Sequence, residues 1–176
     1  MGFLKNKSAV GLLAPFPKCH PQRVNTRILP TFAAILVFVC CLPCPAKDTG
    51  EWLAESSGAK SITGDLTIYS ELIKINLNAF PLQWVRNLTT AEVSAAFDAD
   101  INAGSTGVLY RTTIPASRHF VHRNTLCGSD DTHWMATFVS GHTLQVAFFS
   151  GSEIPVFTLE ALRNSTSLCG TFSYTR

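Results

Sequence analysis

The chain has 176 residues, 46% of them hydrophobic and 15% charged, a length that suits one domain of ordinary size. Its charge is unevenly distributed. Residues 1–46 contain five Lys and Arg and no Asp or Glu, whereas residues 47–176 contain nine Lys and Arg against twelve Asp and Glu, a net charge of −3. A mildly acidic body lacks the basic footprint that phosphate backbones require, which argues against nucleic acid as a partner.

An apolar run over residues 32–42 lies between the basic Arg23 and Arg27 and the small-residue sequence that ends at Ala46. This order of basic, apolar and small residues is typical of a secretory signal. We therefore predict that residues 1–46 are a signal peptide, cleaved between Ala46 and Lys47, and that the protein is periplasmic or secreted. A helix of this length would rise only about 16 Å, against a hydrocarbon core of about 30 Å. The alternative is an uncleaved segment, membrane-anchored through residues 28–44.

Four of the six cysteines fall within residues 1–46, so Cys127 and Cys169 are the pair left after cleavage. Both stand in a Leu-Cys-Gly context. An oxidising compartment favours a disulfide between them. Buried free thiols, or thiols that act as nucleophiles, are the alternatives.

The mature chain is predicted to consist of a flexible arm over residues 47–60 and a single β-rich domain over residues 61–176. The strict apolar and polar alternation over residues 73–78 predicts a strand with one buried face. A partner strand is expected over residues 61–68, and a third strand over residues 82–86, after a turn at Phe80-Pro81.

The capping-box sequence Thr89-Thr90-Ala91-Glu92 predicts a short helix over residues 91–97. Residues 108–114, rich in β-branched side chains and followed by Pro115, predict another strand. The runs on either side of Gly141-His142 predict a hairpin with a type II′ turn. The last expected elements are strands at residues 156–157 and 170–174, with a helical turn at residues 159–162 between them.

Short strands joined by turns indicate the fold class. We predict a mainly β protein, an antiparallel barrel or sandwich of six to eight strands with one or two short helices. Aromatic residues are expected to fill its core, although a ligand-binding barrel mouth is an alternative use for them. These residues are Trp84, Trp134, Phe138, Phe148, Phe149 and Phe172.

Alternating oxygen-bearing side chains make Asp98, Asp100 and Asn102 a weak candidate metal site, because calcium-binding loops have this spacing. Ala103 stands where such a loop has glycine, and Leu109 stands where it has a bidentate glutamate. The sequence therefore favours a polar turn at the end of a helix over a metal site.

His119 and His122 would meet on one face of a helix if Pro115 starts one. No spacing supplies the further ligands of a zinc or copper site, so exposed histidines are the expectation and no cofactor is indicated. The Gly-x-Ser-x-Gly motif of an activated serine nucleophile is absent from the sequence. We therefore expect a non-catalytic binding module for a protein, glycan or small ligand, in the envelope or outside the cell, and keep a hydrolase with an unrecognised site as an alternative.

Two sequence features carry a resemblance: Ile62-Thr63-Gly64-Asp65-Leu66, and the paired Leu-Cys-Gly that leads into Cys169-Gly170-Thr171-Phe172-Ser173-Tyr174. They resemble small exported proteins of Gram-negative bacteria, a group without an assigned function. The predicted architecture is also similar to that of the periplasmic lysozyme inhibitors. Their Ser-Gly-x-x-Tyr inhibitory loop is not matched, since Leu144 follows Ser140-Gly141-His142-Thr143 where tyrosine is wanted.

Overall fold

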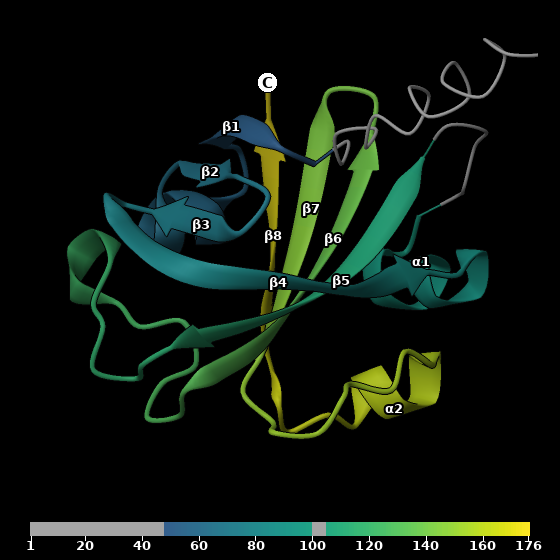
Figure 1. Cartoon of the computed structure of the whole chain (residues 1–176). Helices are drawn as coiled ribbons and strands as arrows, with labels where there is room; N and C mark the ends of the chain where they lie inside the picture. Colours follow the sequence, from purple (N-terminus) through teal and green to yellow (C-terminus); the bar gives the residue numbers. More distant parts are fainter. Residues whose placement is uncertain (1–47, 100–104) are drawn as a thin grey trace, which may run out of the picture. The chain divides into compact units, whose positions relative to one another are not determined.

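The computed structural model of the protein describes residues 48–99 and 105–176 (Figure 1). In these ranges the strands form one closed barrel in which each pairs antiparallel with the next and β8 returns to β1. The strands are β1 (Gly50–Ala54), β2 (Leu66–Ile68), β3 (Leu72–Ile75), β4 (Asn78–Leu88), β5 (Thr106–Ile114), β6 (Thr132–Ser140), β7 (Thr143–Phe149) and β8 (Leu168–Thr175). The helical segments are η1 (Ala59–Thr63), α1 (Thr90–Phe97), η2 (Val121–Arg123) and α2 (Leu159–Arg163).

This architecture confirms the predicted fold class, an antiparallel barrel with few short helices. Figure 1 shows β2, β3 and β4 crossing steeply over β6, β7 and β8, as in an orthogonally packed barrel. The large side chains inside the barrel come from both groups of strands and form one continuous cluster. Its members include Trp52, Leu66, Ile73, Phe80, Tyr110, Met135, Val146, Phe148, Phe172 and Tyr174.

The prediction of a flexible arm over residues 47–60 is wrong, because part of this segment is strand β1. Residues 50–52 pair with β2, and Leu53 and Ala54 pair with the end of β8, so β1 closes the barrel. Trp52 is fully buried at its centre. The Gly, Glu and Ser residues around this tryptophan gave the segment the composition of a loop, but its partners lie at the far end of the chain.

The predicted strand over residues 61–68 begins later than expected. Residues 59–63 form the π-helical turn η1, closed by the Gly64 amide, which donates to the Ala59 carbonyl at 2.8 Å. Gly64 has a φ of 65°, a conformation that suits glycine and lets the chain turn sharply into β2. Only residues 66–68 are therefore extended.

The turn expected at Phe80-Pro81 is also misplaced, since β4 runs straight through this pair. The Leu82 amide donates to the Glu71 carbonyl, on the side of β4 that faces β3. The nitrogen of Pro81 therefore faces the opposite side, where the pairing of β4 with β5 begins only at Leu82. A proline is tolerated in a strand where no ladder hydrogen bond is needed. The turn lies instead at Asn76 and Leu77, whose φ values of 43° and 70° have the signs of a type I′ turn.

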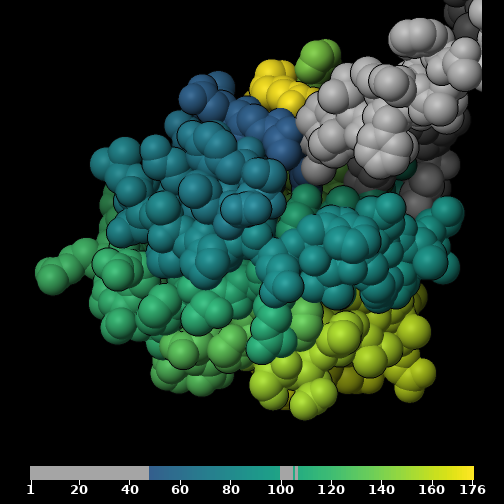
Figure 2. All heavy atoms as spheres, viewed as in Figure 1, coloured from purple at the N-terminus to yellow at the C-terminus, as the bar shows by residue number. Residues whose placement is uncertain are grey.

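Strands β6 and β7 bury side chains on both faces along most of their length, and β5 does so over residues 108–110. Their outer face carries a second cluster, which includes Trp134, Phe138 and Phe149 and is covered by α1 and α2. Gly107 permits the close approach of α1, because a Cβ at this position would lie 2.5 Å from Cγ2 of Val93. Figure 2 shows α1 in teal and the α2 region in yellow-green beside each other on this side of the molecule.

The predicted start of α1 is confirmed in detail. The Thr89 hydroxyl accepts from the Glu92 amide, and the Glu92 carboxylate accepts from the Thr89 amide at 2.8 Å, which is a complete capping box. Arg86 donates to both carboxylate oxygens of Glu92, at 2.7 and 2.8 Å. This guanidinium, together with the bonds from Thr89, lowers the pKa of Glu92 to about 2.

The predicted β6–β7 hairpin is confirmed, with Gly141 at a φ of 59° and His142 at a negative φ, as a type II′ turn requires. The final strand and the helical turn are present as β8 and α2. No strand forms at residues 156–157. Pro155 has no amide to donate there, and the buried Phe157 ring packs edge-on against Phe149, outside the barrel.

Candidate functional site

The barrel interior is packed with the protein's own side chains. Trp52, Tyr110, Phe148 and Tyr174 are each at most 3% exposed, and an eight-stranded barrel is just wide enough for side chains to fill it. The expected core aromatics Trp134, Phe138, Phe148, Phe149 and Phe172 are also buried. A ligand is therefore expected to meet the outside of this barrel.

Trp84 is the exception among these aromatic residues, because it is 56% exposed. The pairing of β4 with β5 shifts register between Trp84 and Arg86. Such a bulge bends the strand and re-aims the side chains next to it. The prediction that Trp84 fills the core is therefore wrong.

A buried polar cluster holds the start of β1 against the barrel. Asp48 is 2% exposed, and its Oδ2 accepts from the hydroxyls of Tyr110 and Thr137, both at 2.8 Å. Burial, together with the Asp48 carboxylate, raises the pKa of Tyr110 well above its usual range. The Nε1 of Trp52 donates to the Asp48 carbonyl at 2.8 Å. These bonds join β1 to β5 and β6. The sequence does not predict this structural role, because Asp48 falls within the predicted flexible arm.

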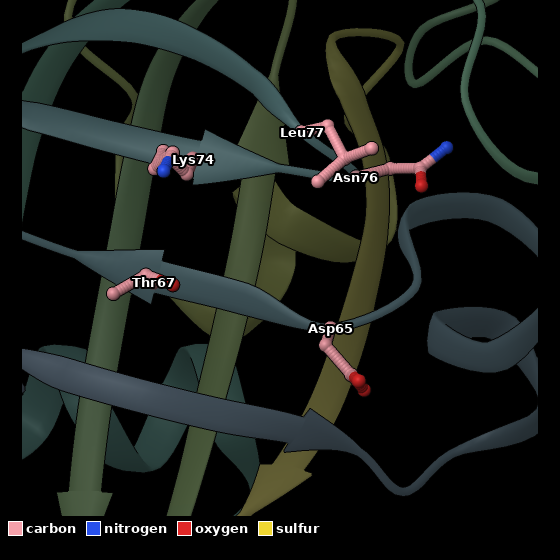
Figure 3. A pocket seen from close by; sticks show the side chains of 5 residues that line it. All are labelled: Asp65, Thr67, Lys74, Asn76 and Leu77. Atoms are coloured by element: carbon pink, nitrogen blue, oxygen red, sulfur yellow. The ribbon is translucent and has the colours of Figure 1, made fainter.

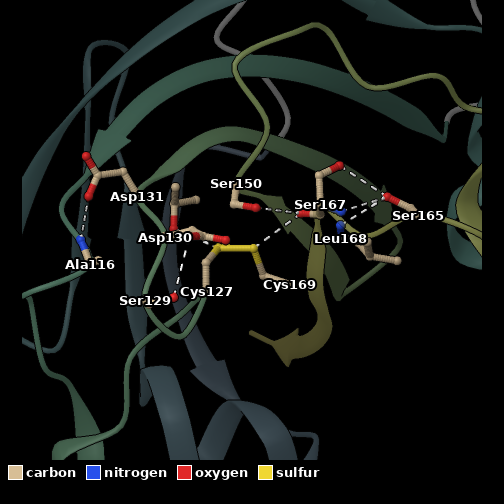
Figure 4. The surroundings of a disulfide bond; sticks show 11 residues. Ala116, Cys127, Ser129, Asp130, Asp131, Ser150, Ser165, Ser167, Leu168 and Cys169 are labelled. Carbon is tan, nitrogen blue, oxygen red and sulfur yellow. Dashed lines mark hydrogen bonds between the residues drawn. A yellow bond between two sulfur atoms is a disulfide. The ribbon is translucent and has the colours of Figure 1, made fainter.

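The predicted disulfide is present, with Cys127 and Cys169 bonded at an S–S distance of 1.95 Å (Figure 4). Neither thiol is then free to act as a nucleophile. Cys169 lies where the pairing of β7 with β8 shifts register, and Cys127 belongs to the loop between β5 and β6. The bond therefore fastens that loop to the last strand.

The loop between β5 and β6 also covers part of the barrel core. Its Phe120 and Leu126 are each 6% exposed within the inner cluster. The Phe120 ring meets Phe80 edge-on at a centroid distance of 5.9 Å. The Asn124 side chain donates to the Ser61 carbonyl at 2.8 Å, which connects the loop to η1. The loop is thus fixed by its disulfide, its core contacts and this hydrogen bond.

A surface groove of about 250 Å³ lies beside α2, between the end of β7 and the start of β8. Its wall includes Phe149, Pro155 and Leu162. Two aliphatic side chains of the groove, Ile154 and Val156, are 54% and 63% exposed. Leu159, on the first turn of α2, is 52% exposed. These three exposed aliphatic side chains lie within residues 154–159, and we term them the aliphatic patch.

A second hollow, of about 280 Å³, is polar and lies over β2, β3 and the hairpin turn that follows (Figure 3). Asp65, Thr67, Lys74, Asn76 and Leu77 line it. One oxygen of Asp65 already accepts from the Ala54 amide at 2.8 Å. Because this carboxylate is engaged in joining β1 to β2, the hollow is a weaker candidate for a ligand site than the groove at α2.

The structure describes only part of the candidate metal site. Asp98 ends α1 in the left-handed conformation, with a φ of 49°, and its amide donates to the Ser94 carbonyl. Asp100 and Asn102 lie outside the described residues. Across 48–99 and 105–176, no group of three or more His, Cys, Asp and Glu side chains is arranged to hold a metal ion.

The helix that would join His119 and His122 does not form. The chain makes a turn at Pro115, in which the Arg118 amide donates to the Pro115 carbonyl, and only residues 121–123 are helical. His122 itself has a φ of 52°, outside the helical region. The expectation of exposed histidines is met at both positions.

The predicted signal peptide, residues 1–46, lies outside the described residues. Among the helices that are described, none has the length and apolar character needed to cross a bilayer. Comparison of the chain with protein-family models, with curated proteins and with solved structures found no match in any of the three.

Proposed function

We propose that this protein is an exported, non-catalytic binding module whose groove at α2 receives apolar side chains of a partner protein. The observation that carries the proposal is the aliphatic patch of Ile154, Val156 and Leu159 beside the groove. Exposed apolar patches with a polar rim mark interaction sites on soluble proteins. Ser165, Ser167 and Glu153 supply polar groups around the same groove.

The size of the groove favours protein side chains over a small molecule. Small-molecule sites occupy about 300–1,000 Å³, and the groove has about 250 Å³. It would hold one or two apolar side chains. Phe157, buried against Phe149 at a ring distance of 5.7 Å, anchors the segment that presents the patch. A preformed surface of this kind loses little conformational entropy on binding.

Site-specific photo-crosslinking in the cells that produce the protein tests this proposal. A benzophenone side chain placed at Val156 is expected to give one discrete adduct with a partner protein. The same group at Leu77, which is 93% exposed at the far hairpin turn, serves as the matched control and is expected to give none. A glycan or a small apolar ligand as the true partner would leave both positions without a protein adduct.

A second variant distinguishes binding in the groove from nonspecific hydrophobic contact with the aliphatic patch. Ala161 lines the groove on α2, and Ala161→Leu fills it with an aliphatic group while keeping a good helix former. The adduct at Val156 is expected to be lost in this variant, whose melting temperature should stay near that of the parent. Persistence of the adduct, or equal adducts at positions 77 and 156, would contradict the proposal.

Export is the other part of the proposed function. A disulfide is compatible with an oxidising, extracytoplasmic compartment, and the sequence predicts cleavage between Ala46 and Lys47. Amino-terminal sequencing of the protein recovered from its native compartment should begin at Lys47. The membrane-anchored alternative retains residues 28–44, so a mass that includes residues 1–46 in a membrane fraction would favour that form.

A further inference from the structure

The loop between β5 and β6 carries an exposed basic sequence, Arg118-His119-Phe120-Val121-His122-Arg123, which we term the cationic loop. Arg118, His119, His122 and Arg123 are all exposed, whereas Phe120 between them is buried in the barrel core. In Figure 1 its short helix lies at the left edge of the barrel, away from α2 at the lower right. The cationic loop is therefore a surface distinct from the groove of the proposed function.

The backbone of the cationic loop is held in an unfavourable conformation. His122 and Arg123 have φ values of 52° and 62°, a left-handed region that non-glycine residues adopt at a cost in free energy. The Phe120 amide donates to the Asn124 carbonyl at 2.8 Å, which closes the loop around these two residues. Strain that the surroundings maintain in this way is common at binding sites.

The two arginines of the cationic loop are not used by the fold. Other arginines are engaged: Arg86 pairs with Glu92, and Arg111 stacks over Trp134 at 4.8 Å. Within the part of the chain that the structure describes, no carboxylate forms an ion pair with Arg118 or Arg123. Both guanidinium groups can therefore meet an anion from outside.

The acidic side chains at the other end of the same loop have partners of their own. Asp131 accepts from the Ala116 amide at 2.8 Å, and Asp130 accepts from the Ser129 hydroxyl at 3.5 Å. The bond to Ala116 holds Asp131 at the base of the loop, where β5 ends and β6 begins, whereas Asp130 bonds to its own neighbour. This arrangement leaves the positive charge at its tip.

His119 adds an oriented ring to the cationic loop. Its Nδ1 lies 2.8 Å from the Ser117 carbonyl. A carbonyl can only accept, so Nδ1 carries the proton of this bond. The Nε2 atom has no protein partner among the described residues. In this tautomer it is an acceptor, so it can bond only to a hydroxyl of a protonated phosphate.

We propose that the cationic loop binds one compact phosphate or diphosphate group, carried by a lipid headgroup or by a small soluble compound. Guanidinium groups match phosphate oxygens with paired hydrogen bonds. The net charge of −3 over residues 47–176 repels an extended polyanion. This charge favours a compact phosphate or diphosphate over an extended polyanion.

The test uses the mature protein and two probes, inorganic pyrophosphate and phosphatidylcholine vesicles with or without phosphatidylglycerol. At low salt, calorimetry measures the binding of pyrophosphate and co-sedimentation measures the binding to vesicles. Binding to pyrophosphate alone identifies a soluble ligand, and binding to the anionic vesicles alone identifies a headgroup. Either result supports the phosphate site, and in both arms added salt should weaken binding.

The double variant Arg118→Gln/Arg123→Gln is expected to bind at least about tenfold more weakly, because charge-assisted hydrogen bonds are lost. Lys74→Gln/Arg163→Gln removes the same charge elsewhere on the surface and should bind like the parent. Melting curves of both variants check that the fold is intact. The proposal is overturned by equal weakening in the two variants, or by a parent protein that binds neither pyrophosphate nor the anionic vesicles.

Discussion

Replacing Cys127 and Cys169 by serine is expected to lower the free energy of unfolding by about 4 kcal/mol. The disulfide closes a loop with a sequence separation of 42 residues, and the chain-entropy model assigns about this stabilisation to a loop of that length. The domain has a total stability of roughly 5–15 kcal/mol. The double variant should therefore melt about 10–20 °C below the parent, as measured by circular dichroism, and reduction of the parent should reproduce the shift.

A matched variant distinguishes the covalent bond from the contacts of the loop that it fastens. Asn124→Ala removes the hydrogen bond from the loop to the Ser61 carbonyl and keeps the disulfide. One such bond contributes about 1 kcal/mol, so this variant should melt only a few degrees lower. If the cysteine double variant melts no lower than Asn124→Ala, the bond does not have the stabilising role assigned to it.

The features predicted correctly from the sequence are those with a local cause. The capping box of Thr89 and Glu92 forms within one turn of helix, and Gly141 allows the positive φ of its own hairpin turn. The Cys127–Cys169 pairing needed only a count of the cysteines that follow residue 46. The capping box and the hairpin turn are thus formed by the same few residues whose sequence predicts them. The disulfide follows from there being two cysteines to pair.

The features that were missed depend on distant partners. Strand β1 exists because Leu53 and Ala54 pair with β8 at the end of the chain. Asp48 was missed for the same reason, since its hydroxyl donors come from Tyr110 and Thr137. No short window of sequence contains these contacts.

The residues that carried the resemblance at the start of the domain have a structural explanation. Asp65 accepts from the Ala54 amide of β1 at 2.8 Å. The Thr63 hydroxyl lies 2.7 Å from the hydroxyl of Tyr174 on β8, and Gly64 between them provides the turn at a φ of 65°. This short sequence therefore joins both strands at which the barrel closes.

Alkaline pH is expected to unfold the protein cooperatively, because two of its three tyrosines are buried. Tyr110 and Tyr174 are 3% and 0% exposed. Burial raises the pKa of both hydroxyls well above the usual value, and the Asp48 carboxylate raises that of Tyr110 further. The folded state thus retains the two phenolic protons that the unfolded chain loses at a pH of about 10.

The direction of this effect follows from proton linkage. Since the folded state binds these protons more tightly, their contribution to stability is complete below a pH of about 10 and is lost as the pH rises above it. Each tyrosine then removes about 1.4 kcal/mol per pH unit, or about 2.8 kcal/mol for the pair. A rise of a few pH units above 10 therefore offsets a large part of a stability of roughly 5–15 kcal/mol.

Tyrosinate absorbance and circular dichroism, followed together as the pH is raised, test this expectation. The absorbance of the two buried tyrosines should appear in the same transition in which the β signal is lost. Tyr174→Phe should halve the slope of stability against pH, because one of the two buried phenols is removed. The Thr63 hydroxyl loses Tyr174 as a partner in this variant but keeps its bond to the Ala59 carbonyl at 3.1 Å. Tyr69→Phe, at a position that is 45% exposed, serves as the control and should leave the transition in place. Ionisation of both buried tyrosines while the barrel stays folded would show that their hydroxyls are accessible, and the packed interior described above would then be wrong.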